Sequence, residues 1–160
     1  MTTMDPQQAA VLDGVRQLGE RLPFNRHLGV EVIEVVPGRA RTRLPENEAL
    51  ANHVGGVHAI AELAPVELAG ALALSSRVTP LFERGYVPVV GGLQVRYTAP
   101  AVGDLVATAE VGDDVLAAAL AAADAGDRPR FDVEVSVTDP AGTEVLQASL
   151  HFVFILVAPA

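Results

Sequence analysis

The sequence contains no cysteine, and its 11 basic residues, all arginine, are outnumbered by 20 acidic ones, for a net charge of −9. Without cysteine the chain can form no disulfide, no thiolate metal site and no cysteine nucleophile. A protein that follows the phosphates of a nucleic acid needs the opposite charge on at least one face. The composition therefore argues against a disulfide scaffold, a thiolate-bound metal and a nucleic-acid partner.

Long apolar runs are also missing, although 50% of the residues are apolar. The longest unbroken runs cover Val115–Ala123 and Phe152–Ala158, whereas a membrane-spanning helix needs roughly 20 apolar residues. The N-terminus lacks the basic and apolar regions of a secretory signal. With 160 residues, of which 19% are charged, we expect one folded cytoplasmic domain without a membrane segment.

Common catalytic signatures are absent as well. The chain has no Gly-x-Ser-x-Gly turn and no H-E-x-x-H zinc motif. The one candidate phosphate loop, Gly55-Gly56, is not followed by Gly-Lys-Ser/Thr. We therefore expect no metal ion, and we interpret His27 and His151 as structural or surface residues.

The periodicity of the apolar residues predicts an α+β fold. Helical spacing begins after Asp5 and Pro6, an N-cap and a first helical residue, and ends near Pro23. The remaining predicted elements are strands at Gly29–Val36 and Arg39–Leu44, a long apolar helix at Val57–Ser76, strands at Val87–Tyr97 and Leu105–Val111, a helix at Asp114–Ala125, and strands at Arg130–Asp139 and Thr143–Val157. We expect an N-terminal helical segment, 1–23, and one domain, 24–160, whose antiparallel sheet wraps around the long helix.

Some features of these elements leave alternatives open. The arginines of the strand 39–44 share one face, which is either an anion-binding stripe or, as we favour, a solvated surface. Pro65 lies inside the long helix, so we expect either a kink or a later helix start. Leu93, Val95 and Tyr97 are predicted to belong to the core rather than to an acyl pocket.

The stretch from Leu50 to Gly70 carries the strongest functional signal. Glycines and polar residues crowd the entrance of an otherwise apolar helix, in which Glu62 and Glu67 would be costly to bury unpaired. A helix N-terminus presents free N–H groups to a carbonyl that becomes an oxyanion. A buried carboxyl with a raised pKa can act as a base. Together these are two parts of an acyl-transfer site.

The same stretch contains four residues at a recognisable spacing. Asn52 lies six residues before His58, and Gly55 lies three residues before it. Glu67 lies nine residues after the same histidine. A second passage, Gly92–Val111, joins two strands through Pro-Ala-Val-Gly-Asp. In both passages the chain resembles the hotdog-fold acyl-CoA thioesterases, in particular their phenylacetate-pathway branch and a related family of uncharacterised domains.

The resemblance extends over residues 24–156 and implies a hotdog fold and the hydrolysis of an acyl-CoA or acyl-carrier thioester. It implies that Glu67 acts as base or nucleophile and that the backbone amides at His58 and Ala59 polarise the carbonyl. Asn52 is either a turn residue or, in addition, a residue that fixes Glu67 or the attacking water.

Substrate binding is assigned to three further residues. We expect Gly55 and Gly56 to contact the substrate. Arg96 is assigned to the phosphates of coenzyme A, which Arg128 and Arg130 could also meet, with an ordinary surface position as the alternative for each arginine. No cofactor is expected, because coenzyme A is part of the substrate. Where the thioesterase branch usually has Gly-Gly after the histidine, this chain has Ala59-Ile60.

The spacing of the candidate residues also predicts an assembly. At about 100° per residue, His58 and Glu67 would lie on opposite sides of one helix and could not serve the same site within one chain. A homodimer, or a dimer of dimers, with paired central helices would bring Glu67 of one subunit to the amides of the other. Glu62, four residues after His58, competes with Glu67 for the acidic role because it could pair directly with His58. We interpret it as a structural partner of His58 or as a residue that supports the site from behind.

Two other functions remain open at this stage. One is a non-catalytic hotdog module that binds acyl-CoA or lipid. The other is a hotdog hydratase or dehydratase, whose usual pairing of histidine and acid is not evident in this sequence.

Overall fold

The computed structural model describes residues 5–157, which form four α-helices, one short 3-10 helix and six strands. They are α1 (Pro6–Glu20), α2 (Pro23–Leu28), β1 (Glu31–Val36), β2 (Arg39–Leu44), η1 (Glu48–Leu50), α3 (Leu63–Glu83), β3 (Tyr86–Tyr97), β4 (Leu105–Glu110), α4 (Val115–Asp124), β5 (Arg130–Thr138) and β6 (Glu144–Leu156). The outer ends of the predicted segments 1–23 and 24–160, residues 1–4 and 158–160, lie outside the described residues.

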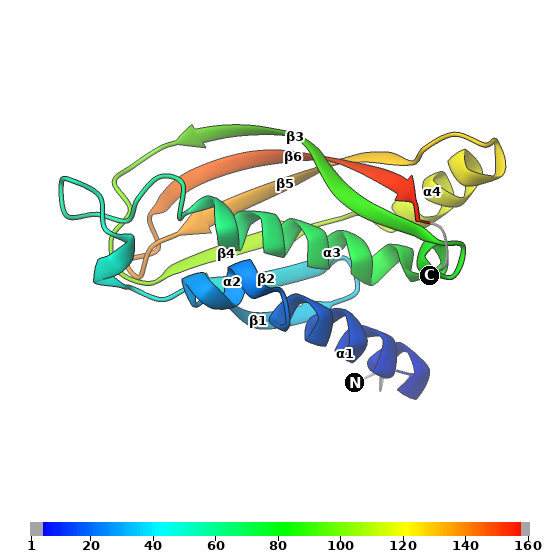
Figure 1. The fold of residues 1–160 in the computed structure, drawn as a ribbon, viewed down its shortest axis with the longest axis horizontal. Coiled ribbons are helices and arrows are strands. Elements are labelled where there is room, and N and C mark those ends of the chain that lie inside the picture. The colour runs from blue at the N-terminus through cyan, green and yellow to red at the C-terminus, as the bar shows by residue number, and fades with distance from the viewer. Residues whose placement is uncertain (1–4, 158–160) are drawn as a thin grey trace.

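The strands form one antiparallel sheet in the order β1-β2-β4-β5-β6-β3. Alternate residues of the central strands are buried, among them Leu105, Ala107, Ala109, Val133, Val135 and Val137. Figure 1 shows the sheet curving around α3. The predicted α+β architecture, a sheet wrapped around one long helix as in a hotdog fold, is confirmed.

The central helix α3 is apolar on nearly every side, as the sequence predicts. Six of its side chains are wholly inaccessible to solvent: Val66, Ala69, Ala73, Leu74, Val78 and Leu81. At Gly70 the helix approaches β6 so closely that a Cβ atom would lie 2.5 Å from the Leu150 side chain. The missing side chain lets helix and sheet pack directly against each other.

Both ends of α3 differ from the prediction. The helix begins at Leu63 rather than Val57, so Pro65 occupies its first turn, where a backbone N–H has no helical partner to lose. This is the later start that the sequence left open. At the other end α3 continues past Ser76 to Glu83, with a break at Val78 two residues before Pro80. Pro80 lacks the N–H that would bond to the Ser76 carbonyl, which explains the break.

The N-terminal region contains one helix more than the sequence predicts. α1 begins at the expected cap, where the Asp5 side chain accepts a hydrogen bond from the N–H of Gln7 (3.2 Å). It packs on α3, and a Cβ at Gly19 would touch the Leu72 side chain at 2.9 Å. The short helix α2 then replaces the expected direct connection to the first strand, and it ends at Gly29 with φ +77°.

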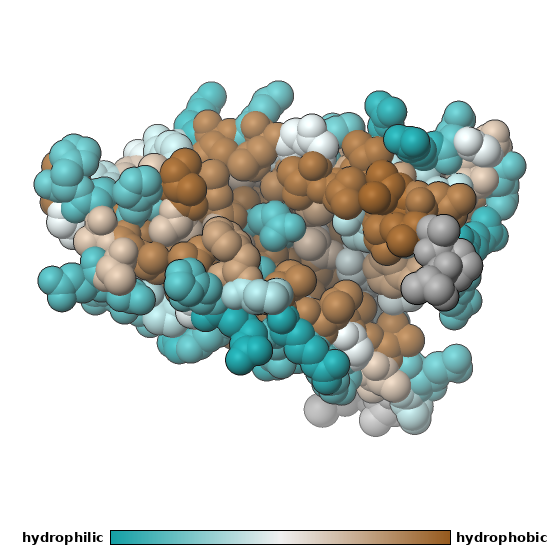
Figure 2. Space-filling model, viewed as in Figure 1, coloured by the Kyte–Doolittle hydropathy of each residue, from teal (hydrophilic) through white to brown (hydrophobic). Residues whose placement is uncertain are grey.

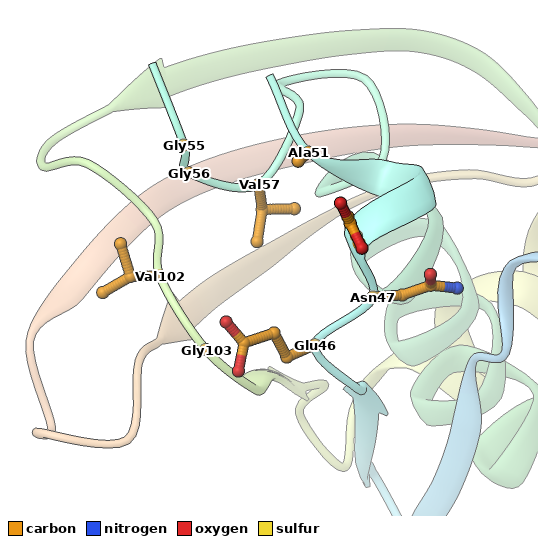
Figure 3. Close-up of a pocket in the computed structure, with 9 residues that line it drawn as sticks. Glu46, Asn47, Ala51, Gly55, Gly56, Val57, Val102 and Gly103 are labelled. Carbon is orange, nitrogen blue, oxygen red and sulfur yellow. The ribbon is translucent and has the colours of Figure 1, made fainter. Parts of the chain in front are cut away.

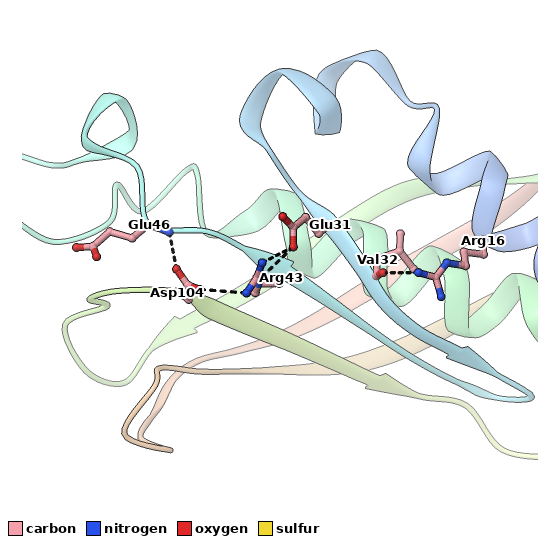
Figure 4. Close-up of polar contacts among 6 residues, drawn as sticks. All are labelled: Arg16, Glu31, Val32, Arg43, Glu46 and Asp104. Carbon is pink, nitrogen blue, oxygen red and sulfur yellow. Dashed lines mark hydrogen bonds and ion pairs between the residues drawn. The ribbon is translucent and has the colours of Figure 1, made fainter.

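The arginine-bearing face of β2 is a solvated, ion-paired surface. Arg39 pairs with Glu34 of β1 (3.0 Å), and Arg43 pairs with Glu31 (2.6 Å), while both guanidinium groups stay partly exposed. Figure 4 shows the Arg43 pair at the β1–β2 hairpin. The structure therefore supports the solvated interpretation rather than the anion-binding stripe.

The opposite edge strand, β3, is exposed and apolar. Val87, Val89, Val90, Leu93 and Tyr97 all keep more than a third of their surface accessible, and apolar surface follows this edge in Figure 2. The prediction that Leu93 and Tyr97 are core residues is wrong, because β3 lies at the margin of the sheet; Val95 is half-buried. In the part of the chain that the structure covers, no helix has the length and apolarity to cross a membrane.

Candidate active site

The segment between η1 and α3 is a compact loop held by one side chain. The side-chain oxygen of Asn52 accepts hydrogen bonds from the N–H groups of Val54 and Gly56, and its amide donates to the carbonyl of Val57, all at 3.0 Å. Such local bonds from asparagine are typical of tight turns. Asn52 therefore orders this loop, and one amide N–H is left for a substrate or a water molecule.

The backbone of the loop requires glycine at two positions, one because of its conformation and the other because of a close contact. Gly55 has φ +84°, in the left-handed region that residues with a Cβ rarely adopt. At Gly56 a Cβ atom would lie 2.8 Å from the carbonyl oxygen of Ala101. The next residue, Val57, donates its N–H to that same carbonyl (2.9 Å), which fastens the loop to residues 99–102.

His58 organises the turn that leads into α3. Its N–H donates to the carbonyl of Leu50 (2.8 Å), its carbonyl accepts from the N–H of Glu62 (3.2 Å), and its Nδ1 accepts from the N–H of Ile60 (3.2 Å). An accepting Nδ1 in a neutral imidazole places the proton on Nε2. Of the two amides predicted to hold a substrate carbonyl, that of His58 is thus already engaged, which leaves Ala59.

The N–H of Ala59 has no acceptor among residues 5–157. It lies just before α3, where the N-terminal end of the helix dipole favours negative charge. The hydroxyl of Tyr97, the last residue of β3, donates to the Ala59 carbonyl at 2.8 Å. This bond holds the turn against the edge strand of the sheet and keeps the free N–H in place.

A cavity of about 320 Å³ adjoins this turn. Asn52, Gly56, Ala59 and Glu62 line one side of it, and residues 99–102 line the other. Ile60 and His58 instead line a separate apolar cavity of about 360 Å³ beside α2. The turn therefore borders two cavities, and Ile60 lines the one that Ala59 does not line.

Glu62 is the ionisable residue of the Ala59 cavity. Its side chain is 4% exposed, and its Oε2 atom has no hydrogen-bond partner in the described part of the chain. Burial raises the pKa of this carboxyl to about 7. Burial, and after it the charge on Glu62, raises the pKa of Tyr97. The predicted pairing of Glu62 with His58 is wrong, because the two side chains lie in a turn rather than on one helix face and His58 faces the other cavity.

Glu67 lies farther along α3, half-buried, and burial raises its pKa as well. It does not line the Ala59 cavity of its own chain. The argument that His58 and Glu67 occupy opposite sides of one helix is wrong, because α3 begins at Leu63 and His58 lies before it. Within one protomer the structure brings together Ala59, Glu62 and the Asn52 loop, and leaves Glu67 apart from them.

Arg96 is not brought to these cavities either. It lies opposite Gln147 on the sheet face turned away from α3. A cavity of about 430 Å³ on the other side of Gly55–Val57 is bordered by Glu46 and Glu48 (Figure 3), and these carboxylates would repel the phosphates of coenzyme A. Among the described residues, no cluster of three or more His, Asp or Glu side chains is placed to bind a metal ion.

The Pro-Ala-Val-Gly-Asp passage has a structural role next to the cavity. Asp104 accepts a hydrogen bond from the N–H of Glu46 (2.8 Å) and pairs with Arg43 (3.4 Å), as Figure 4 shows. Gly103, with φ +70°, makes the turn that precedes β4. These contacts fix residues 99–102, one wall of the Ala59 cavity.

Comparison with solved structures places the chain among hotdog-fold proteins. PA5026 of Pseudomonas aeruginosa, a protein of unknown function named "Probable Thioesterase", is 22% identical, with a TM-score of 0.77 over 89% of this chain and 93% of that one. Thioesterase HI1161 of Haemophilus influenzae is 17% identical, with a TM-score of 0.69 over 99% and 95%. The PaaI protein from the phenylacetic acid degradation operon of E. coli is 14% identical, with a TM-score of 0.70 over 92% and 95%.

The family assignment follows from the sequence itself. The chain belongs to the family described as a domain of unknown function, DUF4442, whose model matches residues 15–154. The match includes the whole sheet up to Phe154 and the central helix, so it covers the resemblance that the two motifs indicate. A search of the curated proteins found no similar sequence.

Proposed function

We propose that this protein is a thioesterase that hydrolyses an acyl-CoA or acyl-carrier thioester as a homodimer. The observation that carries the proposal is the N–H of Ala59 at the entrance of α3, which has no acceptor in the described part of the chain and adjoins a cavity that a buried carboxyl group lines. The hotdog fold that the chain shares with HI1161 supports it. No cofactor is required, because coenzyme A or the carrier enters as part of the substrate.

The proposed reaction needs an oxyanion donor and a carboxylate. The thioester carbonyl oxygen accepts from the Ala59 N–H, which becomes a stronger partner as that oxygen gains negative charge. Glu67 of a second protomer activates water or attacks the carbonyl carbon itself. If water attacks, the C–S bond breaks to give a carboxylic acid and a thiol, and the leaving thiolate takes up the proton that Glu67 removed. If Glu67 attacks, loss of the thiol leaves a mixed anhydride on Glu67, which water then hydrolyses to the carboxylic acid. Glu67 is assigned to a second protomer because it does not line the cavity of its own.

Association along β3 would complete such a site. The strand is 12 residues long and pairs only with β6 among the described residues, so its outer edge offers free backbone groups. Its accessible apolar side chains would be covered by a second copy. Tyr97, which holds the Ala59 turn, ends this strand, so a partner on β3 would lie beside the catalytic turn.

Release of free thiol tests the proposal directly. Acetyl-, hexanoyl-, palmitoyl- and phenylacetyl-CoA are offered to the full chain, and the thiol is measured with a chromogenic disulfide. Turnover of at least one ester by the wild type, abolished in a folded Glu67→Gln variant, is the expected result. Glutamine keeps the shape of the side chain and removes only its charge.

Two results would point elsewhere. Saturable binding of these esters without thiol release would indicate a non-catalytic binding module. Turnover by Glu67→Gln equal to that of the wild type would remove Glu67 from the mechanism. A hydratase is less well supported, because the Nδ1 atom of His58 is engaged by the N–H of Ile60.

A further inference from the structure

The proposed thioesterase site has one amide donor where two donors are commonly used. The N–H of His58 is bound to the carbonyl of Leu50, so the backbone of this turn offers an approaching carbonyl only the N–H of Ala59. Glu62 lines the same cavity, and the chemistry described above gives it no role. We propose that the Glu62 side chain, as a neutral carboxylic acid, is the second hydrogen-bond donor to the thioester oxygen.

Burial keeps this carboxyl group in its neutral form. Glu62 is 4% exposed, its Oε2 atom has no partner among residues 5–157, and the cavity lining contains no cation. A buried carboxylate without a donor or counter-charge is costly, so the protonated form is favoured. The pKa of about 7 that results leaves a large protonated fraction at neutral pH. A carboxylic acid kept neutral in an apolar site can donate a hydrogen bond to an oxyanion.

The position of Glu62 in the chain suits this role. It is the residue before α3 and has helical backbone angles, φ −59° and ψ −23°. Ala59 lies three residues earlier, in the turn that leads into α3. Ala59 and Glu62 line one cavity, whereas His58 and Ile60 line the other.

The groups around Glu62 leave its proton free for a substrate. The loop 52–57 and residues 99–102 contribute no ionisable side chain to the cavity lining. On β3 the hydroxyl of Tyr97 is engaged with the Ala59 carbonyl. On the turn itself the Nδ1 atom of His58 is engaged with the N–H of Ile60, and on α3 the Glu67 of the same chain does not line the cavity. The Glu67 carboxylate that the proposed function brings from a second protomer adds negative charge, which disfavours ionisation of Glu62 further. When Glu62 ionises, it can only accept hydrogen bonds, and its charge repels the oxyanion.

Two substitutions distinguish a hydrogen-bonding role of the Glu62 side chain from a role in packing alone. Glu62→Gln retains N–H groups that can donate at every pH, whereas Glu62→Met has a similar length and no donor. The turnover number of both variants and the wild type is measured from pH 5.5 to 9 with the best ester of the four-member panel. Circular dichroism and light scattering confirm that each variant is folded and has the wild-type mass.

The inference predicts a specific pattern. Wild-type turnover falls as the pH rises through about 7. Glu62→Gln stays within about tenfold of the wild type at pH 6 and loses the alkaline fall. Glu62→Met loses about 10²- to 10³-fold at pH 6, the usual effect of removing one oxyanion donor.

Other patterns would overturn the inference. A folded Glu62→Met variant with wild-type turnover and an unchanged pH profile would show that no donor is lost. Equal inactivity of both variants would show that a titrating group, not a donor, is needed. If the wild type itself releases no thiol from any ester, the proposed function fails and this inference, which rests on it, fails with it.

Discussion

The two edges of the sheet are built in opposite ways. At the β1 edge, Arg16 of α1 donates to the carbonyl of Val32 (3.1 Å), and Arg43 pairs with Glu31 across the hairpin (Figure 4). At the β3 edge, a 12-residue strand presents accessible apolar side chains such as Leu93. A long apolar edge invites pairing, whereas a covered and charged one resists it. The difference supports the proposal that a second copy of the chain pairs along β3, whereas β1 faces solvent.

The same contrast applies to the acidic residues. Glu31 and Glu34, both in β1, are at least partly exposed and paired with arginines. Glu62, whose charge acts on Tyr97 of β3, is buried and its Oε2 atom has no partner in the part of the chain described. Charge is thus stabilised at one edge and suppressed near the other. This is the arrangement that a site completed by a second protomer along β3 would need.

The largest expected effect comes from placing a charge on the β3 edge. Leu93→Asp should convert the dimer to a monomer and abolish thioester hydrolysis, because the carboxylate would be buried without a counter-charge in the interface. Ile33→Asp on β1 is the matched control, since Ile33 and Leu93 are both 40% exposed. It should keep the dimer mass and the turnover. Light scattering and thiol release measure the two properties.

This comparison can fail in two ways. A wild-type monomer at micromolar concentration would remove the two-chain site altogether. Dissociation of the dimer by Ile33→Asp rather than by Leu93→Asp would place the interface at the β1 edge instead of the β3 edge.

Removing the free amide should have the next largest effect. Ala59→Pro deletes an N–H that makes no hydrogen bond within residues 5–157 and should lower kcat by about 10²- to 10³-fold. The fold should survive, because the substitution breaks no backbone bond of the turn. Ala59→Gly keeps the N–H and should keep the turnover. His58→Ala should cost less than Ala59→Pro, since the His58 amide is already engaged by Leu50.

Mixing two inactive variants then tests whether the site spans two chains. Ala59→Pro and Glu67→Gln subunits, exchanged by brief dilution, should recover up to about a quarter of wild-type turnover. In half of the dimers one of the two sites regains both groups. No recovery after verified exchange would place the amide and the carboxylate in one chain.

The fold was predictable from the sequence because its patterns are local. Alternation along β4 and β5 and the all-round apolar character of α3 indicate a sheet around a helix. The start of α3 was harder to predict, because Val57–Glu62 has helical composition but is held in turns by bonds to Leu50 and Ala101. Those partners are distant in sequence or belong to another element, so no local pattern contains them.

The candidate site was predictable in part. The spacing of Asn52, His58 and Glu67 drew attention to the segment in which the Ala59 amide has no acceptor among residues 5–157. The engagement of the His58 amide and the contact of Tyr97 with the turn depend on tertiary hydrogen bonds that spacing does not encode. The role proposed for Glu62 had one signal in the sequence, which is an acidic residue three positions after Ala59 at the start of an apolar helix.

The burial of Glu62 should also make stability depend on pH. Its folded-state pKa of about 7 lies above the usual pKa of 4.5 for a glutamate side chain, so the folded protein holds the proton more tightly than the unfolded one. The contribution of Glu62 to the free energy of unfolding is therefore fully present below pH 4.5 and is lost as the pH rises through about 7, by at most about 3 kcal/mol. Glu62→Gln should remove this part of the loss between pH 5 and pH 8, measured by urea unfolding. The same decline in wild type and variant would mean that Glu62 is ionised in the folded state.

The smallest effect is expected from the ion pairs of the β1–β2 hairpin. Arg43 and its partners Glu31 and Asp104 are all more than a third exposed, so solvent screens their attraction. Arg43→Ala should lower the free energy of unfolding by less than about 1 kcal/mol, and the loss should shrink in 0.5 M salt, because ions screen exposed charges. Arg41→Ala, on the same face of β2 and without an ion pair in the described structure, is the control for lost side-chain packing. A loss of several kcal/mol, or a change in the mass of the dimer with Arg43→Ala, would mean that this edge too takes part in assembly.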